Sequence, residues 1–265
     1  MKIYVINLDR AEDRMSKMRA QLSDLGLPFE RVPAVDGSMI DRSRFPHSQR
    51  INGEIGCSLS HCAAWQALLR STDKHALILE DDAVLSRDLA SLLENTDLIP
   101  ADADLLKLET TTAPTVLARM KYATVSGRQI RRLIGRHTGT AGYIISRDFA
   151  EKAIAKVARA DVPVDIALFD EDAVKQAVVY QVDPAPVIQE MFASRNRNGA
   201  AYEADSLTAM LCAHEMPEKK PRPRGLKLVW REITRPFRRM YALFLPKFRF
   251  QLNHRNGRRG PVPFA

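Results

Sequence analysis

The sequence has few cysteines, no internal repeat and no long apolar segment. Its three cysteines, Cys57, Cys62 and Cys212, are an odd number without the spacing of a metal-binding motif, which is typical of a protein from a reducing compartment. No window approaches the roughly 20 apolar residues of a transmembrane helix. The first residues become charged too early for a signal peptide. These absences predict a protein that is made and kept in the cytoplasm.

Excess positive charge is absent from most of the chain, although the net charge is +8. Residues 217–265 contain 14 of the 40 lysines and arginines but only 2 of the 32 aspartates and glutamates, a net charge of +12. The other 26 basic and 30 acidic residues give residues 1–216 a net charge of −4. A chain of 265 residues is long enough for one large α/β domain with an extension. We therefore expect a slightly acidic domain over 1–216 and a separate basic C-terminal part.

Strand and helix patterns alternate along the first part of the chain. Such alternation predicts an α/β fold with a mostly parallel, doubly wound sheet and some antiparallel additions. The expected strands lie at 3–8, 29–34, 76–79, 104–108, 122–125, 129–134, 142–145 and 178–182. The expected helices lie at 11–25, 54–69, 89–95, 148–158 and 166–177.

Three adjacent carboxylates follow a buried strand. The apolar run 76–79 is typical of a strand that is buried on both faces, and it is followed by Glu80, Asp81 and Asp82. Strand alternation would place Glu80 and Asp82 on one side and Asp81 on the other. Two oxygen donors at the end of a central strand can hold Mg²⁺ or Mn²⁺ against a diphosphate. The alternative is an ordinary acidic turn in which Asp82 or Ser86 caps the next helix.

A second polar stripe lies on the expected helix 54–69. Glu54, Ser58 and His61 are separated by four and three residues, so they share one face of this helix. Most polar stripes face solvent, but His61 has small and apolar neighbours rather than lysines and glutamates. The core-facing stripe of the same helix consists of Ile55, Leu59, Cys62 and Leu69.

These residues belong to a set of motifs that resembles glycosyltransferase family 25, the lipooligosaccharide galactosyltransferases and their collagen-modifying relatives. The motifs occur in the family's order over residues 2 to 190. The resemblance implies a single Rossmann-like nucleotide-sugar domain of the GT-A type, with inverting transfer from a UDP-sugar, usually UDP-galactose, and a divalent metal. The matching segments are 5–10 with Arg14, 34–37, 53–61 with Trp65, 78–82, 139–143 with Ser146, and 163–165.

The resemblance also implies roles for individual residues. Glu80 and Asp82 match the acidic motif that holds Mn²⁺ or Mg²⁺, although this sequence has Glu where the GT-A pattern often has Asp. The expected donor-binding residues follow the first two strands, lie on one face of the helix 54–69, or lie in the glycine-containing loop 139–143. They are Asn7, Arg10, Arg14, Asp36, Gly37, Glu54, Ser58, His61, Gly142 and Tyr143. Tyr143 in that loop either stacks on a sugar or is a buried strand residue. Arg14 can also be read as part of a solvated helix start.

An inverting displacement needs one base for the acceptor hydroxyl. Asp165 matches the family's Pro-Val-Asp pattern and is the preferred candidate, with Asp81 and Glu109 next. The alternative for Asp165 is the N-cap of the helix that follows. The acidic residues 170–172 are expected to form a solvated helix turn.

The basic part contains an amphipathic pattern over Gly225–Leu245. An aromatic-rich stripe lies opposite an arginine-rich face, which is typical of a helix at an anionic membrane surface, and Pro236 is expected to kink or divide it. Alternatives are a helix that docks on the catalytic domain, a disordered basic end, or a nucleic-acid surface, although no recognised nucleic-acid module accompanies it. We expect a helical extension over 217–252, a disordered tail over 253–265 and peripheral attachment to the inner face of the plasma membrane.

The sequence therefore predicts a UDP-sugar-dependent hexosyltransferase with a lipid-linked glycan, such as lipooligosaccharide or lipopolysaccharide, as acceptor. Two other classes stay open. A catalytically inactive glycan-binding or scaffold protein can keep the same fold, although the intact Glu80 and Asp82 pair argues against it. A receiver-like signalling domain also has acidic residues at strand ends, but there the acidic pair lies near the first strand.

Overall fold

The computed structural model describes residues 1–193 and 257–265. Cys212 and the expected basic helix over 225–245 lie outside the described residues, as do the boundaries at 216 and 252. Within the described part, no helix combines the length and the apolar content needed to cross a bilayer.

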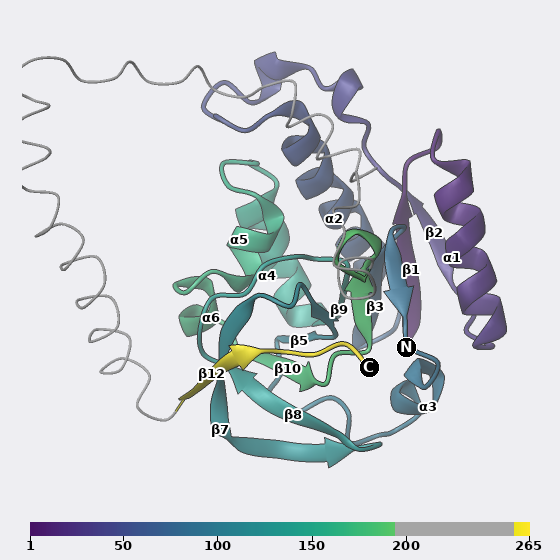
Figure 1. Cartoon of the computed structure of the whole chain (residues 1–265). Coiled ribbons are helices and arrows are strands. Elements are labelled where there is room, and N and C mark those ends of the chain that lie inside the picture. Colours follow the sequence, from purple (N-terminus) through teal and green to yellow (C-terminus); the bar gives the residue numbers. More distant parts are fainter. Residues whose placement is uncertain (194–256) are drawn as a thin grey trace, which may run out of the picture.

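The described residues form a central sheet of nine strands in the order β12-β7-β8-β10-β5-β9-β3-β1-β2 (Figure 1). Three of its eight neighbouring pairs are parallel: β1 with β2, β1 with β3, and β5 with β10. The other five are antiparallel. The strands are β1 Lys2–Asn7, β2 Glu30–Pro33, β3 His75–Glu80, β5 Leu105–Lys107, β7 Pro114–Val125, β8 Arg128–Leu133, β9 Gly142–Ser146, β10 Val179–Asp183 and β12 Gly257–Pro261.

The α/β class and the mixed sheet are confirmed, but the prediction that the sheet is mostly parallel is wrong because five of its eight neighbouring pairs are antiparallel. The strand β9 lies antiparallel between β3 and β5, which would otherwise continue the parallel half. Apolar periodicity identifies a strand, but it carries no information about the direction of the neighbouring strand. The direction is decided by the connections, and those are set by tertiary packing.

Helices cover both faces of the sheet. On one face, α2 (Asn52–Arg70), α4 (Arg147–Val157) and α5 (Val164–Phe169) pack on a core that includes Trp65 and Leu68. On the other face, α1 (Glu12–Asp24) and α3 (Leu89–Leu93) pack on a core that includes Met18. The predicted helix 166–177 is divided into α5 and α6 (Ala173–Gln176). Two 3-10 turns, η1 (Gly37–Met39) and η2 (Arg42–Arg44), precede α2.

The strand β3 shows how the sequence produces this layering. All four residues from Ala76 to Leu79 are fully buried, as the apolar run predicts. Ala76 and Ile78 contribute to the core under α2, whereas Leu77 and Leu79 contribute to the core under α1. Because alternate side chains leave a strand on opposite faces, one continuous apolar run supplies both cores.

A small second sheet lies beside the carboxyl end of β3. It consists of β4 (Ala83–Leu85), β11 (Val187–Gln189) and β6 (Glu109–Thr110), in the order β4-β11-β6. These strands have only two or three residues, too few to give a periodic signal in the sequence. They carry Glu109 and Gln189 into the neighbourhood of the acidic residues 80–82.

The end of the chain belongs to the folded body, so the prediction of a disordered tail is wrong for residues 257–265. The strand β12 pairs antiparallel with β7, Val262 is buried, and its carbonyl accepts a hydrogen bond of 2.6 Å from the Thr110 hydroxyl. This segment is rich in glycine, arginine and proline. An edge strand tolerates all three residue types because one of its backbone edges needs no partner.

Candidate active site

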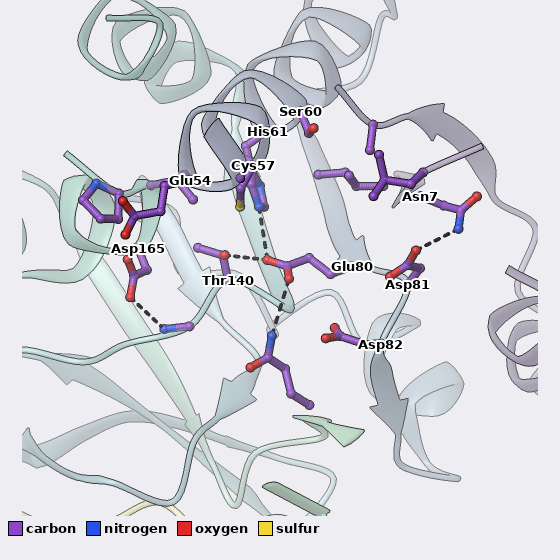
Figure 2. Close-up of a pocket in the computed structure, with 18 of the residues that line it drawn as sticks. Asn7, Glu54, Cys57, Ser60, His61, Glu80, Asp81, Asp82, Thr140 and Asp165 are labelled. Carbon is purple, nitrogen blue, oxygen red and sulfur yellow. Dashed lines mark hydrogen bonds and ion pairs between the residues drawn. The ribbon is translucent and has the colours of Figure 1, made fainter. Parts of the chain in front are cut away.

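A cavity of about 470 Å³ opens at the carboxyl ends of β1 and β3 (Figure 2). Its wall contains most of the site residues predicted from the sequence, which come from β1 and the turn after it, α1, η1, α2, the end of β3 and the turn after it, and α5. They are Asn7, Arg10, Arg14, Gly37, Glu54, His61, Glu80, Asp81, Asp82 and Asp165. Asn7 and Asp165, which are 158 positions apart in the sequence, therefore share one cavity.

The three adjacent carboxylates all face this cavity, which corrects the expected separation of Asp81 from its neighbours. The strand β3 ends at Glu80, and Asp81 and Asp82 lie in the turn that follows. Strand alternation no longer applies in a turn, so the backbone can direct all three side chains to the same side.

Glu80 is held by hydrogen bonds from three elements. Its Oε1 accepts hydrogen bonds from His61 Nε2 at 3.2 Å and from the Thr140 hydroxyl at 2.5 Å, and Gln189 Nε2 lies 3.5 Å from Oε2. Burial by itself raises the pKa of this carboxyl, but the contacts with His61, Thr140 and nearby Lys107 together lower it. Glu80 is therefore fixed in position and ionised at neutral pH.

A chain of buried hydrogen bonds supports His61 from behind. Trp65 Nε1 donates to the Tyr143 oxygen at 2.8 Å, and the same oxygen lies 2.8 Å from His61 Nδ1. Because Trp65 already supplies a donor, the Tyr143 hydroxyl is free to donate its own proton to Nδ1. A neutral imidazole then carries its proton on Nε2 and directs it at Glu80.

Asp81 has a different set of partners. Asn7 Nδ2 donates to its Oδ2 at 2.7 Å, and Arg14 Nη1 lies 3.1 Å from Oδ1. Burial raises the pKa of Asp81 and outweighs the opposing effects of Arg14 and Asn7. Arg14 thus supports the acidic turn from α1, and the solvated alternative for this residue is excluded.

Asp82 lacks such partners within the described residues. Its Oδ1 is buried and accepts no hydrogen bond there. Burial, and then the charges of Glu80 and Asp81, raise its pKa well above the ordinary value. A buried carboxylate oxygen without a donor, beside two further carboxylates, is stabilised by a bound cation. The residues of this turn therefore fit a divalent cation.

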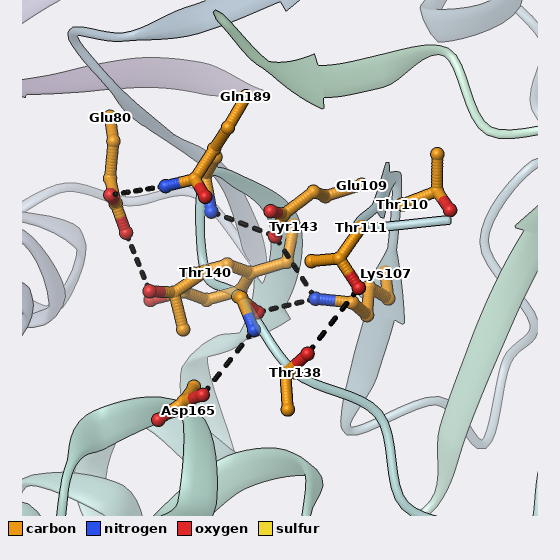
Figure 3. Close-up of polar contacts among 12 residues, drawn as sticks. Glu80, Lys107, Glu109, Thr110, Thr111, Thr138, Thr140, Tyr143, Asp165 and Gln189 are labelled. Carbon is orange, nitrogen blue, oxygen red and sulfur yellow. Dashed lines mark hydrogen bonds and ion pairs between the residues drawn. The ribbon is translucent and has the colours of Figure 1, made fainter. Parts of the chain in front are cut away.

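The loop from Thr138 to Ala141 lies beside Glu80 (Figure 3), and its first three residues line the cavity. Lys107 Nζ donates to the Gly139 carbonyl, and Glu109 Oε2 accepts from the Ala141 amide at 2.9 Å. The Ala141 carbonyl in turn accepts from the Glu80 amide at 3.1 Å. Gly139 has a φ of +84°, and a Cβ there would overlap the Glu109 carboxylate. This position therefore requires glycine.

Asp165 lies in the first turn of α5 and faces the same loop. Its Oδ2 is 3.4 Å from the Gly139 amide, and its Oδ1 accepts from the Ile166 amide at 2.8 Å. Pro163 holds the N-cap position, so the N-cap alternative for Asp165 is excluded. Figure 2 shows Asp165 and Asn7 at opposite ends of the cavity with Glu80 between them.

Four predicted donor-binding residues do not line the cavity. Ser58 and Tyr143 are buried behind its wall, which is the alternative that the sequence left open for Tyr143. Gly142 is covered by Val187, whose Cγ1 would lie 2.7 Å from an added Cβ. The close approach at Gly142 is thus to a core side chain and not to a ligand. Asp36 also lies outside the lining and forms an ion pair with Arg10, which does line it.

Sequence reasoning missed other members of the wall. No site role was expected for Cys57, because the three cysteines lack the spacing of a metal-binding motif. The four-residue step from Cys57 to His61 on a helix could have indicated that the two side chains share a face. Thr140 lies in the segment 139–143, but the expected donor-binding residues of that segment were Gly142 and Tyr143. Gln189 gave no signal, because only the pairing of β11 with β6 brings it to Glu80.

Comparison with known proteins identifies the class of enzyme. The model of glycosyltransferase family 25 (LPS biosynthesis protein) matches residues 1–168, a range that contains all the predicted site residues. The chain is 26% identical to the lipooligosaccharide biosynthesis protein lic2B of Haemophilus influenzae over 203 residues, which cover 71% of this chain and 75% of that protein.

Two further comparisons extend this result. The lacto-N-neotetraose biosynthesis glycosyltransferase LgtE of Neisseria meningitidis serogroup B is 28% identical over 218 residues, 74% of this chain and 78% of that protein. A solved glycosyltransferase involved in the glycosylation of the major capsid of PBCV-1 is 9% identical and covers 74% of this chain and 96% of its own, with a TM-score of 0.43. That structural likeness is too weak to carry an argument.

The family match covers more than half of the chain. The chain therefore belongs to glycosyltransferase family 25, and it is a glycosyltransferase whose candidate active site is the cavity at the ends of β1 and β3.

Proposed function

We propose that this chain is a metal-dependent inverting glycosyltransferase of the GT-A type. It transfers a hexose, expected to be galactose, from a UDP-sugar to a lipid-linked glycan such as lipooligosaccharide or lipopolysaccharide. The observation that carries this proposal is the presence of Arg10, Arg14 and the carboxylates 80–82 on one cavity. Arginines and a cation held by carboxylates are the groups that bind a diphosphate. The names of the bacterial relatives suggest the acceptor class.

Glu80 and Asp82 would hold Mn²⁺ or Mg²⁺, which when bound neutralises the negative charge that grows on the departing diphosphate. Asp82 is the stronger candidate ligand because its Oδ1 has no other partner among the described residues. Within the described part of the chain, Glu80 Oε2 has only the long contact with Gln189, so it remains open to a second interaction. Asn7, Arg10 and Gly37 lie on the side proposed for the nucleotide.

Asp165 is the proposed general base. The acceptor hydroxyl would pass its proton to the Asp165 carboxylate while its oxygen attacks the anomeric carbon, and the bond from that carbon to UDP breaks on the opposite side. This geometry needs the base and the nucleotide at opposite ends of the cavity, as Asp165 and Asn7 are (Figure 2). Asp81 is a weaker candidate because Arg14 and Asn7 already occupy its oxygens.

The first test is hydrolysis of UDP-galactose, UDP-glucose and UDP-N-acetylglucosamine by the purified full chain with Mn²⁺ and without acceptor. We expect UDP release from UDP-galactose that stops when EDTA is added. Release that is unchanged by EDTA would contradict metal dependence. No release from any donor and no UDP binding would contradict the proposed donor class.

The second test uses calorimetry of UDP binding with Mn²⁺. We expect Asp82→Asn to lower the affinity for UDP at least tenfold, about 1.4 kcal/mol of binding free energy, because a neutral amide is a poorer ligand for the cation. Glu94→Gln is the matched control, since Glu94 is an exposed carboxylate outside the cavity. Equal affinities in the two variants would remove Asp82 from the metal site.

A further inference from the structure

A second group of potential metal ligands lies on the cavity wall beside the acidic turn. One ligand atom each from Cys57, His61 and Glu80 lies within 4.8 Å of the other two. Figure 2 shows Cys57 and His61 next to each other on α2, above Glu80. Cys57 is half-buried and lines the cavity.

The backbone itself brings these three side chains together. Cys57 and His61 are four residues apart on α2, so their side chains leave the helix on the same face, one turn apart. Glu80 is the last residue of β3, which packs beneath this helix. His61 Nε2 and Glu80 Oε1 are 3.2 Å apart. Two ligands of one tetrahedral Zn²⁺ ion with bonds of about 2.1 Å are separated by roughly 3.4 Å.

The types of ligand select the type of cation. A thiolate, an imidazole and a carboxylate are the ligands that Zn²⁺ takes in proteins, whereas Mg²⁺ and Mn²⁺ prefer oxygen alone. All three residues line the cavity, which leaves space on that side for a fourth ligand such as water. Three protein ligands with one open position are a common zinc arrangement.

Groups behind the ligands hold them in place. Tyr143 contacts Nδ1 of His61, the ring nitrogen that faces away from Glu80. Thr140 donates to Glu80. Such partners orient ligands and fix the tautomer of a metal-bound histidine.

We propose that Cys57, His61 and Glu80 bind Zn²⁺ through Sγ, Nε2 and a carboxylate oxygen. On binding, the Cys57 thiol and His61 Nε2 each release a proton to solvent, and His61 Nδ1 takes up one proton, so that the imidazole stays neutral. The Tyr143 hydroxyl rotates so that its oxygen accepts the hydrogen bond from Nδ1. The site is distinct from the proposed Mn²⁺ or Mg²⁺ site, but the two share Glu80. The regulatory consequence rests on the proposed function: Zn²⁺ bound here takes Glu80 away from the catalytic cation and lowers the rate of transfer.

Cobalt absorption tests the site without reference to activity. Co²⁺ is added to the full chain carrying Cys212→Ser, so that a cobalt–thiolate charge-transfer band comes only from Cys57 or Cys62. We expect this near-ultraviolet band, together with the visible bands of tetrahedral Co²⁺, and we expect Zn²⁺ to abolish both. Cys57→Ser should remove the charge-transfer band. Cys62→Ser is the matched control, because Cys62 lies on the same helix but is buried away from the cavity, and it should keep the band.

Three further measurements complete the test. X-ray absorption of the zinc-loaded, otherwise unchanged chain should show one sulfur at about 2.3 Å and nitrogen or oxygen at about 2.0–2.1 Å. Tyr143→Phe should weaken Co²⁺ binding by about 10–100-fold. Zinc should slow UDP-galactose hydrolysis in the parent chain more than in Cys57→Ser, each compared with its own zinc-free rate.

The outcomes separate this proposal from the proposed function. A charge-transfer band that survives Cys57→Ser, or a zinc absorption spectrum without sulfur, overturns the zinc site. Equal inhibition of the parent and Cys57→Ser overturns the regulatory role. A chain that shows the cobalt–thiolate band but neither binds nor hydrolyses UDP-sugars overturns the proposed function and leaves the zinc site intact.

Discussion

Adjacent side chains of the cavity differ in their surroundings more than in their chemistry. Glu80 has several donors and a lowered pKa, whereas Asp82 lacks donors among the described residues and has a raised pKa. Donors hold the Glu80 carboxylate in position within the site, whereas the Asp82 carboxylate depends on a ligand for its partner. At the scale of single residues, the hydrogen-bond partners therefore distinguish roles that the letters Glu-Asp-Asp do not.

Asp165→Asn should lower kcat by at least about 100-fold, within the usual range for a lost general base, with little change in UDP affinity. The amide keeps an acceptor for the Ile166 amide, so stability should hardly change. Asp161→Asn is the control, because Asp161 is exposed outside the cavity. Steady-state kinetics with calorimetry of UDP measures both effects. Near-normal turnover would move the base to Asp81, because Glu109, the other candidate, is buried outside the cavity.

His137 provides a prediction about pH. Its ring is buried, and neither ring nitrogen has a hydrogen-bond partner within the described residues. Burial, and then the charge of Lys107, hold the pKa of His137 well below its ordinary value of 6.5. Below pH 6.5 the unfolded chain takes up a proton that the folded chain does not, so stability falls as the pH drops from 6.5 towards the lowered pKa. The slope approaches about 1.4 kcal/mol per pH unit.

Urea unfolding between pH 7.5 and 5 measures this slope. His137→Leu should reduce the loss of stability on acidification, whereas His47→Leu, at an exposed position, should not. Burial also lowers the pKa of His75, but His75 is present in both variants, so the comparison isolates His137. Equal slopes in the two variants would show that His137 accepts a proton in the folded chain.

At the scale of elements, the loop from Thr138 to Ala141 connects the candidate base to the acidic turn. Asp165 contacts the Gly139 amide, and Thr140 donates to Glu80. The buried pair of Lys107 and Glu109 holds the same loop from behind, with 3.1 Å between Nζ and Oε2 (Figure 3). A shift of this loop would move both ends of the cavity together.

Lys107→Met should lower the free energy of unfolding by about 3–5 kcal/mol, because it leaves Glu109 buried without its counter-charge. Adding Glu109→Gln should recover part of that loss, since the unpaired charge is then removed. Urea unfolding of both variants measures the coupling. Lys175→Met is the control: this exposed lysine pairs with Glu171 and Asp172 at the surface, and its loss should leave the unfolding midpoint unchanged. A double variant that is less stable than Lys107→Met would contradict the coupling.

At the scale of the whole molecule, the chain returns to the central sheet after residues 194–256. The strand β12 extends the sheet beside β7, and Arg128 Nη2 donates to the Ala265 carbonyl at 2.6 Å while the same guanidinium pairs with Asp88. Any test of the basic segment has to preserve this C-terminal strand. Ending the chain near residue 217 would remove the basic segment and the strand β12 together.

The membrane prediction for 225–245 is therefore best tested by substitution. Trp230, Phe237 and Phe244 are aromatic members of the predicted apolar stripe. Replacing all three with serine should reduce sedimentation with anionic vesicles and leave the melting temperature and UDP binding unchanged, because β12 is retained. High salt should weaken the binding of the parent chain only in part, since screening acts on charges and not on apolar burial. A lower melting temperature in the triple variant would indicate that this segment packs on the catalytic domain.

The sequence by itself determined the features whose causes are local. The apolar run of β3 predicted a strand buried on both faces, the residues after it predicted carboxylates at the end of that strand, and the steps of four and three residues along α2 placed Glu54 and His61 on one face of the helix. These patterns, in order, also indicated the family. They need no knowledge of distant contacts, because helix and strand geometry fix which neighbours share a face.

Only the tertiary structure decided what depends on residues far apart in the chain. The antiparallel insertion of β9, the pairing of β11 that brings Gln189 to Glu80, and the place of β12 in the sheet all follow from long-range packing. The same packing buried Tyr143 and Ser58, exposed Cys57 to the cavity and left Asp82 without a donor among the described residues. A side chain's partners across the fold decide whether it binds a ligand or supports the wall, and local pattern cannot specify those partners.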